Sequence, residues 1–239
     1  MEQIVVDPRQ PNARTIGVVY LLYFLTAFFG LFLTKGVVVP GDAAATATSI
    51  LAHEDLYRSG FAVGLIANAI YISVTVLFYS LFEPVNRSMS LLAAFFSLVG
   101  CSIQICAGVL QLAPLVILGD SQLLSAFKVE QLQVAALLCL KLYSQAFSIA
   151  LILFALYDLL VGYLIFKSTF LPRILGVLLV LAGVGWLTFV WGPLATLLSP
   201  YVLPFGALAE ILLMLWLLVK GVNVSAWRER ANARQAAGT

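Results

Sequence analysis

Apolar residues fill most of the chain in long runs that short polar segments separate. Each run holds about 20 residues or more, and a helix of that length crosses a hydrocarbon core about 30 Å thick. The pattern predicts an all-α, polytopic integral membrane protein, a six-helix transmembrane bundle that forms one domain over residues 1–239. The predicted spans lie near residues 14–38, 59–82, 88–118, 136–166, 172–192 and 203–221.

Prolines mark the ends of the fifth span. Pro172 fits the first turn of that span, where its missing N–H removes no hydrogen bond. The stretch WGPLATLLSPYVLP contains Pro193, Pro200 and Pro204. Because proline inside a helix removes a backbone donor and clashes with the preceding turn, this stretch predicts a broken helix and a hairpin between the fifth and sixth spans.

Two segments outside the spans have amphipathic character. The outer loop, residues 40–58, sets the apolar Ile50, Leu51, Leu56 and Tyr57 beside His53, Glu54 and Asp55, which predicts a short helix on the outer membrane surface. The tail, residues 222–239, is basic and carries Trp227 near the expected lipid boundary. That composition suits an interfacial anchor on an anionic leaflet.

Basic residues are unequally divided between the two sides of the predicted spans. The poorer side has Lys35, Arg58 and Lys128, with Lys141 at the mouth of the fourth span. Since cytoplasmic segments are enriched in Lys and Arg, we predict that the richer side is cytoplasmic and that both termini lie inside. That side collects Arg9, Arg14, Arg87, Lys167, Arg173, Lys220, Arg228, Arg230 and Arg234.

Composition agrees with a membrane protein and narrows the chemistry. The chain is 62% hydrophobic and 10% charged, whereas soluble domains carry about 25% charged residues. A net charge of +2 suggests no nucleic-acid partner. Cys101, Cys106 and Cys139 lie inside apolar runs without metal-like spacing, so we expect small buried hydrophobes.

Catalytic and cofactor signatures are missing from the sequence. His53 is the one histidine of the chain, which excludes a two-histidine zinc or haem site. A Ser-His-Asp triad would depend on this loop histidine, and the sequence contains no nucleotide-binding P-loop motif. We therefore expect no enzyme, no catalytic residue, no metal site and no cofactor.

Small and weakly polar residues recur at helical spacing within several spans. The fourth span has Ala155, Asp158 and Gly162 on one face, and the fifth has Gly176 and Gly183. Small residues let membrane helices approach closely, so the favoured interpretation is helix packing. The alternative is a polar cavity lined by the second, third and fourth spans.

Two carboxyl groups lie deep in predicted spans. Asp158 precedes Lys167 by nine residues, and Glu210 precedes Lys220 by ten. At 1.5 Å per residue, both acids sit roughly 14–15 Å above the basic boundary, near the bilayer middle. A central acid costs about 2.5–3.5 kcal/mol, so each needs protonation, a polar partner or water. If the two acids meet, they would share a proton rather than both ionise.

These two acids belong to a candidate intramembrane polar site. Its other members, in the outer half of the membrane, are Asn68, Gln104 and Gln145. The favoured interpretation of Glu210 is a hydrogen-bonded packing residue. The alternative is a proton or ion path, since intramembrane acids often mark such paths. A wet cavity lined by Glu210 would favour the path, and a dry hydrogen-bonded contact would count against it.

Several segments resemble a family of bacterial membrane proteins known only as domain of unknown function 4386. The similarity spans about residues 13–228, and residues 161–183 are its most specific part. It rests on ARTIGVVYLL, RSGFAVGL, LFEPVNRSMSLLAAFFSLV, VGYLIFKSTFLPRILGVLLVLAG and WLLVKGVNVSAW. The resemblance implies a six-helix protein of the bacterial inner membrane and no particular reaction. It also places Glu210 in an element shared by the family and Asp158 outside the shared pattern.

Three functions are compatible with these features. The favoured one is a non-enzymatic membrane component that acts through the lipid bilayer or through a partner membrane protein. The alternative is a small proton-linked transporter or channel that uses Glu210, with or without Asp158, and functions alone or as a homo-oligomer. An intramembrane enzyme acting on a lipid ranks last, because no nucleophile and base are paired.

Overall fold

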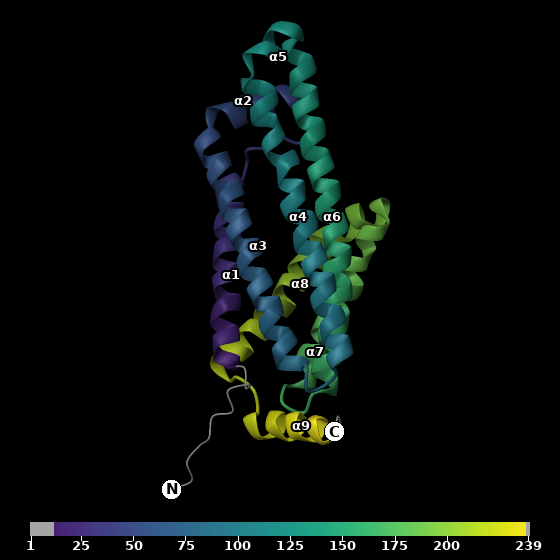
Figure 1. Ribbon diagram of the computed structural model, residues 1–239. Coiled ribbons are helices and arrows are strands. Elements are labelled where there is room, and N and C mark those ends of the chain that lie inside the picture. The colour runs from purple at the N-terminus through teal and green to yellow at the C-terminus, as the bar shows by residue number, and fades with distance from the viewer. Residues whose placement is uncertain (1–11, 238–239) are drawn as a thin grey trace. The chain divides into compact units, whose positions relative to one another are not determined.

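Residues 12–237 are described by the computed structural model, and they are helical without strands. Arg9 lies outside the described residues. The elements are α1 (Ala13–Thr34), α2 (Ala43–Ala52), α3 (Glu54–Phe82), α4 (Arg87–Gly119), α5 (Ser121–Ala126), α6 (Val129–Lys167), α7 (Arg173–Trp186), the 3₁₀ helix η1 (Leu187–Val190), α8 (Gly192–Val219) and α9 (Val224–Ala237) (Figure 1).

Six helical segments in this part of the chain are long and apolar enough to cross a membrane. They are α1, α3, α4, α6, α7 with η1, and α8. The all-α, six-span fold class is therefore confirmed. The predicted helix in the outer loop corresponds to α2, whose N-terminus Asp42 caps by accepting a hydrogen bond from the Ala45 N–H at 2.8 Å.

Some predicted boundaries move for local reasons. The first span was expected to reach residue 38, but α1 ends at Thr34. Gly36, two residues later, has φ 81°, a left-handed conformation that glycine adopts without strain and that terminates helices. Pro172 is the N-cap residue of α7 rather than a residue of its first turn.

The prediction of a broken helix around the three prolines is wrong. Pro193 lies in the first turn of α8, and Pro200 and Pro204 lie within that helix. Membrane helices tolerate internal proline where neighbouring groups satisfy the freed backbone. Trp186 of α7 also ties α7 to this helix, because its indole N–H donates to the Val202 carbonyl at 3.2 Å.

The chain divides into two compact units. Unit 1 comprises the described residues up to Leu21, Ile72–Val99 and the described residues from Leu151 onward. Unit 2 comprises Leu22–Tyr71 and Gly100–Ala150. Helices α1, α3, α4 and α6 each contribute residues to both units.

Glycines bring helices of unit 1 into backbone contact. A Cβ on Gly162 of α6 would lie 2.7 Å from the Gly176 carbonyl oxygen of α7, and one on Gly183 would lie 2.8 Å from that of Ala155. On α1, a Cβ on Gly17 would lie 2.6 Å from the Leu218 nitrogen of α8. The predicted small-residue packing between the fourth and fifth spans is confirmed.

Unit 2 has its own core. Tyr57 of α3 is buried and donates its hydroxyl to the Gln111 carbonyl of α4 at 2.5 Å. The apolar residues buried together with it are Val37, Ile50, Leu115 and Leu140.

The cysteines depart in part from the expectation of burial. Cys101 is buried, Cys139 is half-buried and Cys106 is exposed. An exposed cysteine in an apolar run is consistent with contact to lipid, which solvates an apolar side chain as a protein core does.

Candidate functional site: a buried acidic cluster in unit 1

Glu210 points into unit 1 because of its place on α8. The buried residues of α8 follow the spacing of one helical face, and Glu210 is among them with 5% of its surface exposed. The apolar members of this face are Gly206, Ala209, Leu213, Met214 and Leu217. The carboxyl group is thus held between helices rather than turned toward the exposed face.

Tyr20 of α1 is the hydrogen-bond partner of Glu210. Its hydroxyl donates to Oε2 of Glu210 at 2.5 Å, and the two residues are 190 positions apart in sequence. Tyr20 is 2% exposed, and its ring meets Phe78 of α3 edge to face at 5.7 Å between centroids. The contact is enclosed, and its length lies at the short end of the range of O–H···O hydrogen bonds.

Asp158 of α6 completes the cluster. It is 1% exposed, and its Oδ2 atom has no hydrogen-bond partner among the described residues. Asp158 lies close enough to Glu210 for the two groups to interact electrostatically, and Tyr20 interacts with both. Three helices, α1, α6 and α8, therefore bring two carboxyl groups and one phenol together.

Basic side chains do not neutralise this cluster within the described part of unit 1. The basic residues of this unit sit at helix ends and on α9. Lys167 is nine residues from Asp158 along α6, and Lys220 is ten from Glu210, which corresponds to roughly 14–15 Å of helix rise. Two negative charges in one dry site repel strongly, so the pair demands a bound proton or another cation.

A second polar contact lies in the same unit. The hydroxyls of Thr75 on α3 and Ser97 on α4 are 2.6 Å apart, and both residues are buried. The hollow beside them, bordered by Thr75, Phe78 and Tyr157, leaves no room for a water molecule. The Thr75 and Ser97 hydroxyls are thus paired with each other rather than with solvent.

Only part of the predicted polar site belongs to unit 1. Asp158 and Glu210 do, and they interact electrostatically. Asn68, Gln104 and Gln145 belong to unit 2. Asn68 donates to the Gly64 carbonyl of its own helix at 3.1 Å, Gln104 is half-buried and Gln145 is exposed.

Tyr20 was not among the site residues predicted from sequence. A signal was present, because Tyr20 lies four residues after Ile16 and four before Phe24, and all three are buried. A tyrosine on that inward face needs a partner for its hydroxyl. The depth of Tyr20 is visible in sequence, but its rotation toward Glu210 is not.

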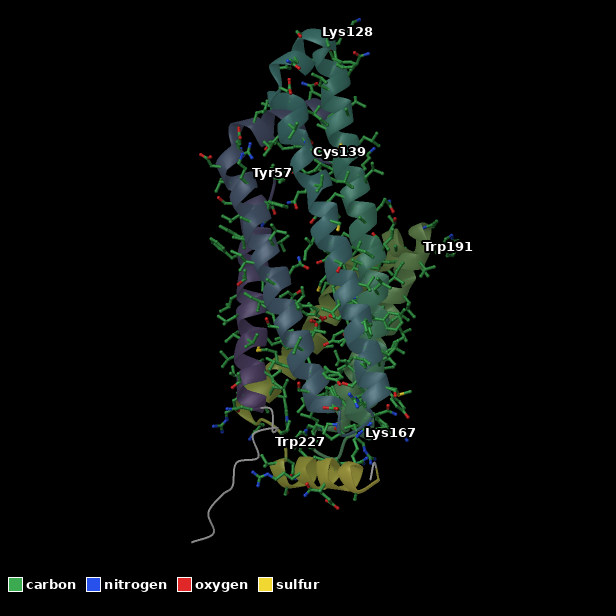
Figure 2. The ribbon with its side chains drawn as sticks, viewed as in Figure 1. Tyr57, Lys128, Cys139, Lys167, Trp191 and Trp227 are labelled. Atoms are coloured by element: carbon green, nitrogen blue, oxygen red, sulfur yellow. The ribbon has the colours of Figure 1, made fainter. Side chains whose placement is uncertain are left out.

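The basic tail forms α9, which docks on unit 1. Trp227 is buried and donates its indole N–H to the Leu81 carbonyl of α3 at 3.0 Å. Arg230 donates to the Lys167 carbonyl at 3.2 Å, and Arg234 to that of Glu83 at 3.0 Å. Figure 2 shows Trp227 and Lys167 at the end of unit 1 that α9 covers. Protein therefore surrounds the Trp227 ring, and its position near the lipid boundary stays a prediction.

The three accepting carbonyls explain why α9 binds there. Leu81 and Lys167 lie in the last turns of α3 and α6, and Glu83 directly follows α3. The final carbonyls of a helix have no partner within that helix and carry partial negative charge. Donors from α9 satisfy them, and the arginines add favourable charge.

No metal site is evident in the part of the chain that the structure describes, because no group of three His, Cys, Asp or Glu side chains gathers there.

Comparisons with known proteins agree with the fold. The family described as domain of unknown function DUF4386 matches residues 15–221. The chain belongs to this family. It is also 25% identical, over 157 residues, to a protein of Archaeoglobus fulgidus described as uncharacterized; the match covers 64% of this chain and 78% of that protein. No solved structure matches. The DUF4386 chain is thus a six-span membrane protein whose family name carries no activity.

Proposed function

We propose that this DUF4386 protein is a non-enzymatic component of a bacterial inner membrane, with both termini in the cytoplasm, that acts through lipid. The observation that supports lipid, rather than a protein partner, is the charge at the α9 end of unit 1. The described basic residues of the unit all gather at that end: Arg14, Arg87, Lys167, Arg173, Lys220, Arg228, Arg230 and Arg234.

Anionic headgroups are the chemistry that fits this end. Arg14, Arg173 and Lys220 are exposed, and none of them makes an ion pair among the described residues. Each basic side chain near an anionic surface contributes about 1 kcal/mol to binding. The docked α9 holds further arginines beside them.

Lipid binding is tested by the affinity of the purified full chain for phosphatidylglycerol and phosphatidylcholine. The variant Arg14→Gln/Arg173→Gln/Lys220→Gln removes about 3 kcal/mol of attraction, so we expect roughly 100-fold weaker phosphatidylglycerol binding. The matched control, Lys35→Gln/Arg58→Gln/Lys128→Gln, removes three cations from unit 2 and leaves the affinity unchanged. Equal affinity for the two lipids would overturn the proposal.

Topology is tested separately. Reporters fused after Thr239 should signal a cytoplasmic location, since the basic ends of α1, α4 and α7 all follow the positive-inside pattern. A periplasmic signal from the C-terminal reporter would contradict the proposed orientation.

A proton-linked carrier or channel is the second candidate, and one observation favours it: Asp158 keeps an unpartnered carboxyl oxygen beside Glu210. The hydrogen bond from Tyr20 counts against it, because that bond closes Glu210 in a dry contact. The test is proton flux in proteoliposomes with the Glu210→Gln variant. If the native chain shows no proton flux, or if the Glu210→Gln variant shows the same flux as the native chain, the carrier or channel function is excluded.

A further inference from the structure

We propose that Asp158 and Glu210, closed by Tyr20, form a binding site for one small monovalent cation, either a proton or Na⁺. The proposal concerns binding at equilibrium. It does not require the cation to cross the membrane, and it rests neither on lipid binding nor on transport.

The site is built from side chains that are almost entirely enclosed. Tyr20, Asp158 and Glu210 are 2%, 1% and 5% exposed. They come from three different helices, so tertiary packing, and not the sequence of a single helix, brings them together. Their position is fixed by close packing, since Gly17 of α1 meets Leu218 of α8 and Gly162 of α6 meets α7.

The unpartnered Oδ2 of Asp158 points to a missing ligand. Glu210 already accepts the Tyr20 hydroxyl, whereas Oδ2 of Asp158 accepts nothing from the described residues. A buried polar atom without a partner costs about 1–3 kcal/mol, more when it is charged. A bound proton or metal ion on this oxygen removes that cost and lowers the net charge of the pair.

The helices around the pair supply no alternative cation. In unit 1, α1 contributes Tyr20, α6 contributes Tyr157 beside Asp158, and both phenols interact with the cluster. The other titratable residues of the unit's spans are Tyr79, Tyr163 and Tyr201, which carry no positive charge, and the basic residues at helix ends. Charge balance at the pair therefore has to come from a bound ion.

Ligand number favours a monovalent ion. Ca²⁺ takes about 6–8 oxygen ligands, and Mg²⁺ demands a near-ideal octahedron of about six. Two carboxyl groups, one of them engaged by Tyr20, fall short of either set, and no third acid joins them among the described residues. A proton needs one oxygen pair, and Na⁺ accepts a smaller and less regular set than a divalent ion.

The decisive measurement is infrared spectroscopy of the full chain in nanodiscs, in Na⁺ and in choline buffers at pH 7. A protonated carboxyl has a C=O stretch that an ionised carboxylate lacks. If the proton is the ligand, the native chain shows this band in choline. If Na⁺ is the ligand, Na⁺ removes the band or gives a measurable binding heat that choline does not give.

Variants assign the signal to the site. The double variant Asp158→Asn/Glu210→Gln should abolish the band and the Na⁺ effect, and each single variant should shift the band or weaken Na⁺ binding at least tenfold, whereas the exposed Glu229→Gln should leave both unchanged. Tyr20→Phe keeps both acids and should shift the frequency of the band. This variant therefore tests the assignment of the band if the acid variants do not fold. Absence of both band and Na⁺ effect in the native chain, or signals that survive in the double acid variant, would overturn the proposal. Cation binding without proton flux would exclude only the carrier or channel function and would leave this proposal intact.

Discussion

Tyr20 of α1 donates a hydrogen bond of 2.5 Å to Glu210 of α8, which ties the first span to the last. This bond is the one described side-chain contact that accounts for an acid in the middle of an apolar helix. Its strength can be measured directly, because phenylalanine removes only the hydroxyl.

Tyr20→Phe should destabilise the protein by about 0.6–1.7 kcal/mol, the range of interhelical hydrogen bonds in membrane proteins. The measurement is reversible unfolding of the chain in mixed micelles. Tyr201→Phe is the control, because Tyr201 lies on α8, the helix of Glu210, and is exposed. Equal stability of the Tyr20 variant and the native chain would show that the bond is energetically neutral.

Gly176→Ala should loosen the contact between α6 and α7. The added Cβ would lie 2.5 Å from the Gly162 carbonyl oxygen, a backbone atom that cannot move alone. Overpacking of this kind costs about 1–3 kcal/mol. Gly64→Ala is the control, since a Cβ there meets nothing within 4 Å; because alanine favours helix over glycine, it should be neutral or stabilising. A stable Gly176→Ala protein would mean that the helices separate without loss.

Thr75 and Ser97 should behave as a coupled pair. Thr75→Val keeps the side-chain shape but leaves the buried Ser97 hydroxyl without this partner, at a cost of about 1–3 kcal/mol. In a double-mutant cycle with Ser97→Ala, the double variant should lose less stability than the two single variants together. Strict additivity would show that the two hydroxyls do not interact.

Trp227→Ala should release α9 from unit 1. The substitution removes the hydrogen bond to Leu81 and the buried ring, so the arginines of α9 become better trypsin substrates. Limited proteolysis with mass spectrometry measures the cleavage rate after Arg228 and Arg230. Ser225→Ala, at an exposed position of the same helix, is the control and should not change the rate. Unchanged cleavage in the Trp227 variant would contradict docking.

Helix positions were predictable from sequence because bilayer thickness and hydrophobic run length constrain them strongly. The ends of α3 and α4 lie within five residues of the prediction. The proline-rich segment misled the prediction, since proline breaks helices in water, whereas membrane helices tolerate internal proline, as α8 does at Pro200 and Pro204.

The sequence by itself determined the membrane class, the six spans and the depth of Asp158 and Glu210, because each follows from composition and from a rise of 1.5 Å per residue. Only the tertiary structure decided what surrounds those acids. Rotation about each helix axis is set by packing partners far apart in sequence, such as Gly17 against Leu218 and Gly162 against Gly176. Packing of this kind turned Tyr20 toward Glu210, brought Asp158 within electrostatic reach of it and buried Trp227 of α9 against the end of α3, and none of these relationships has a counterpart in local sequence.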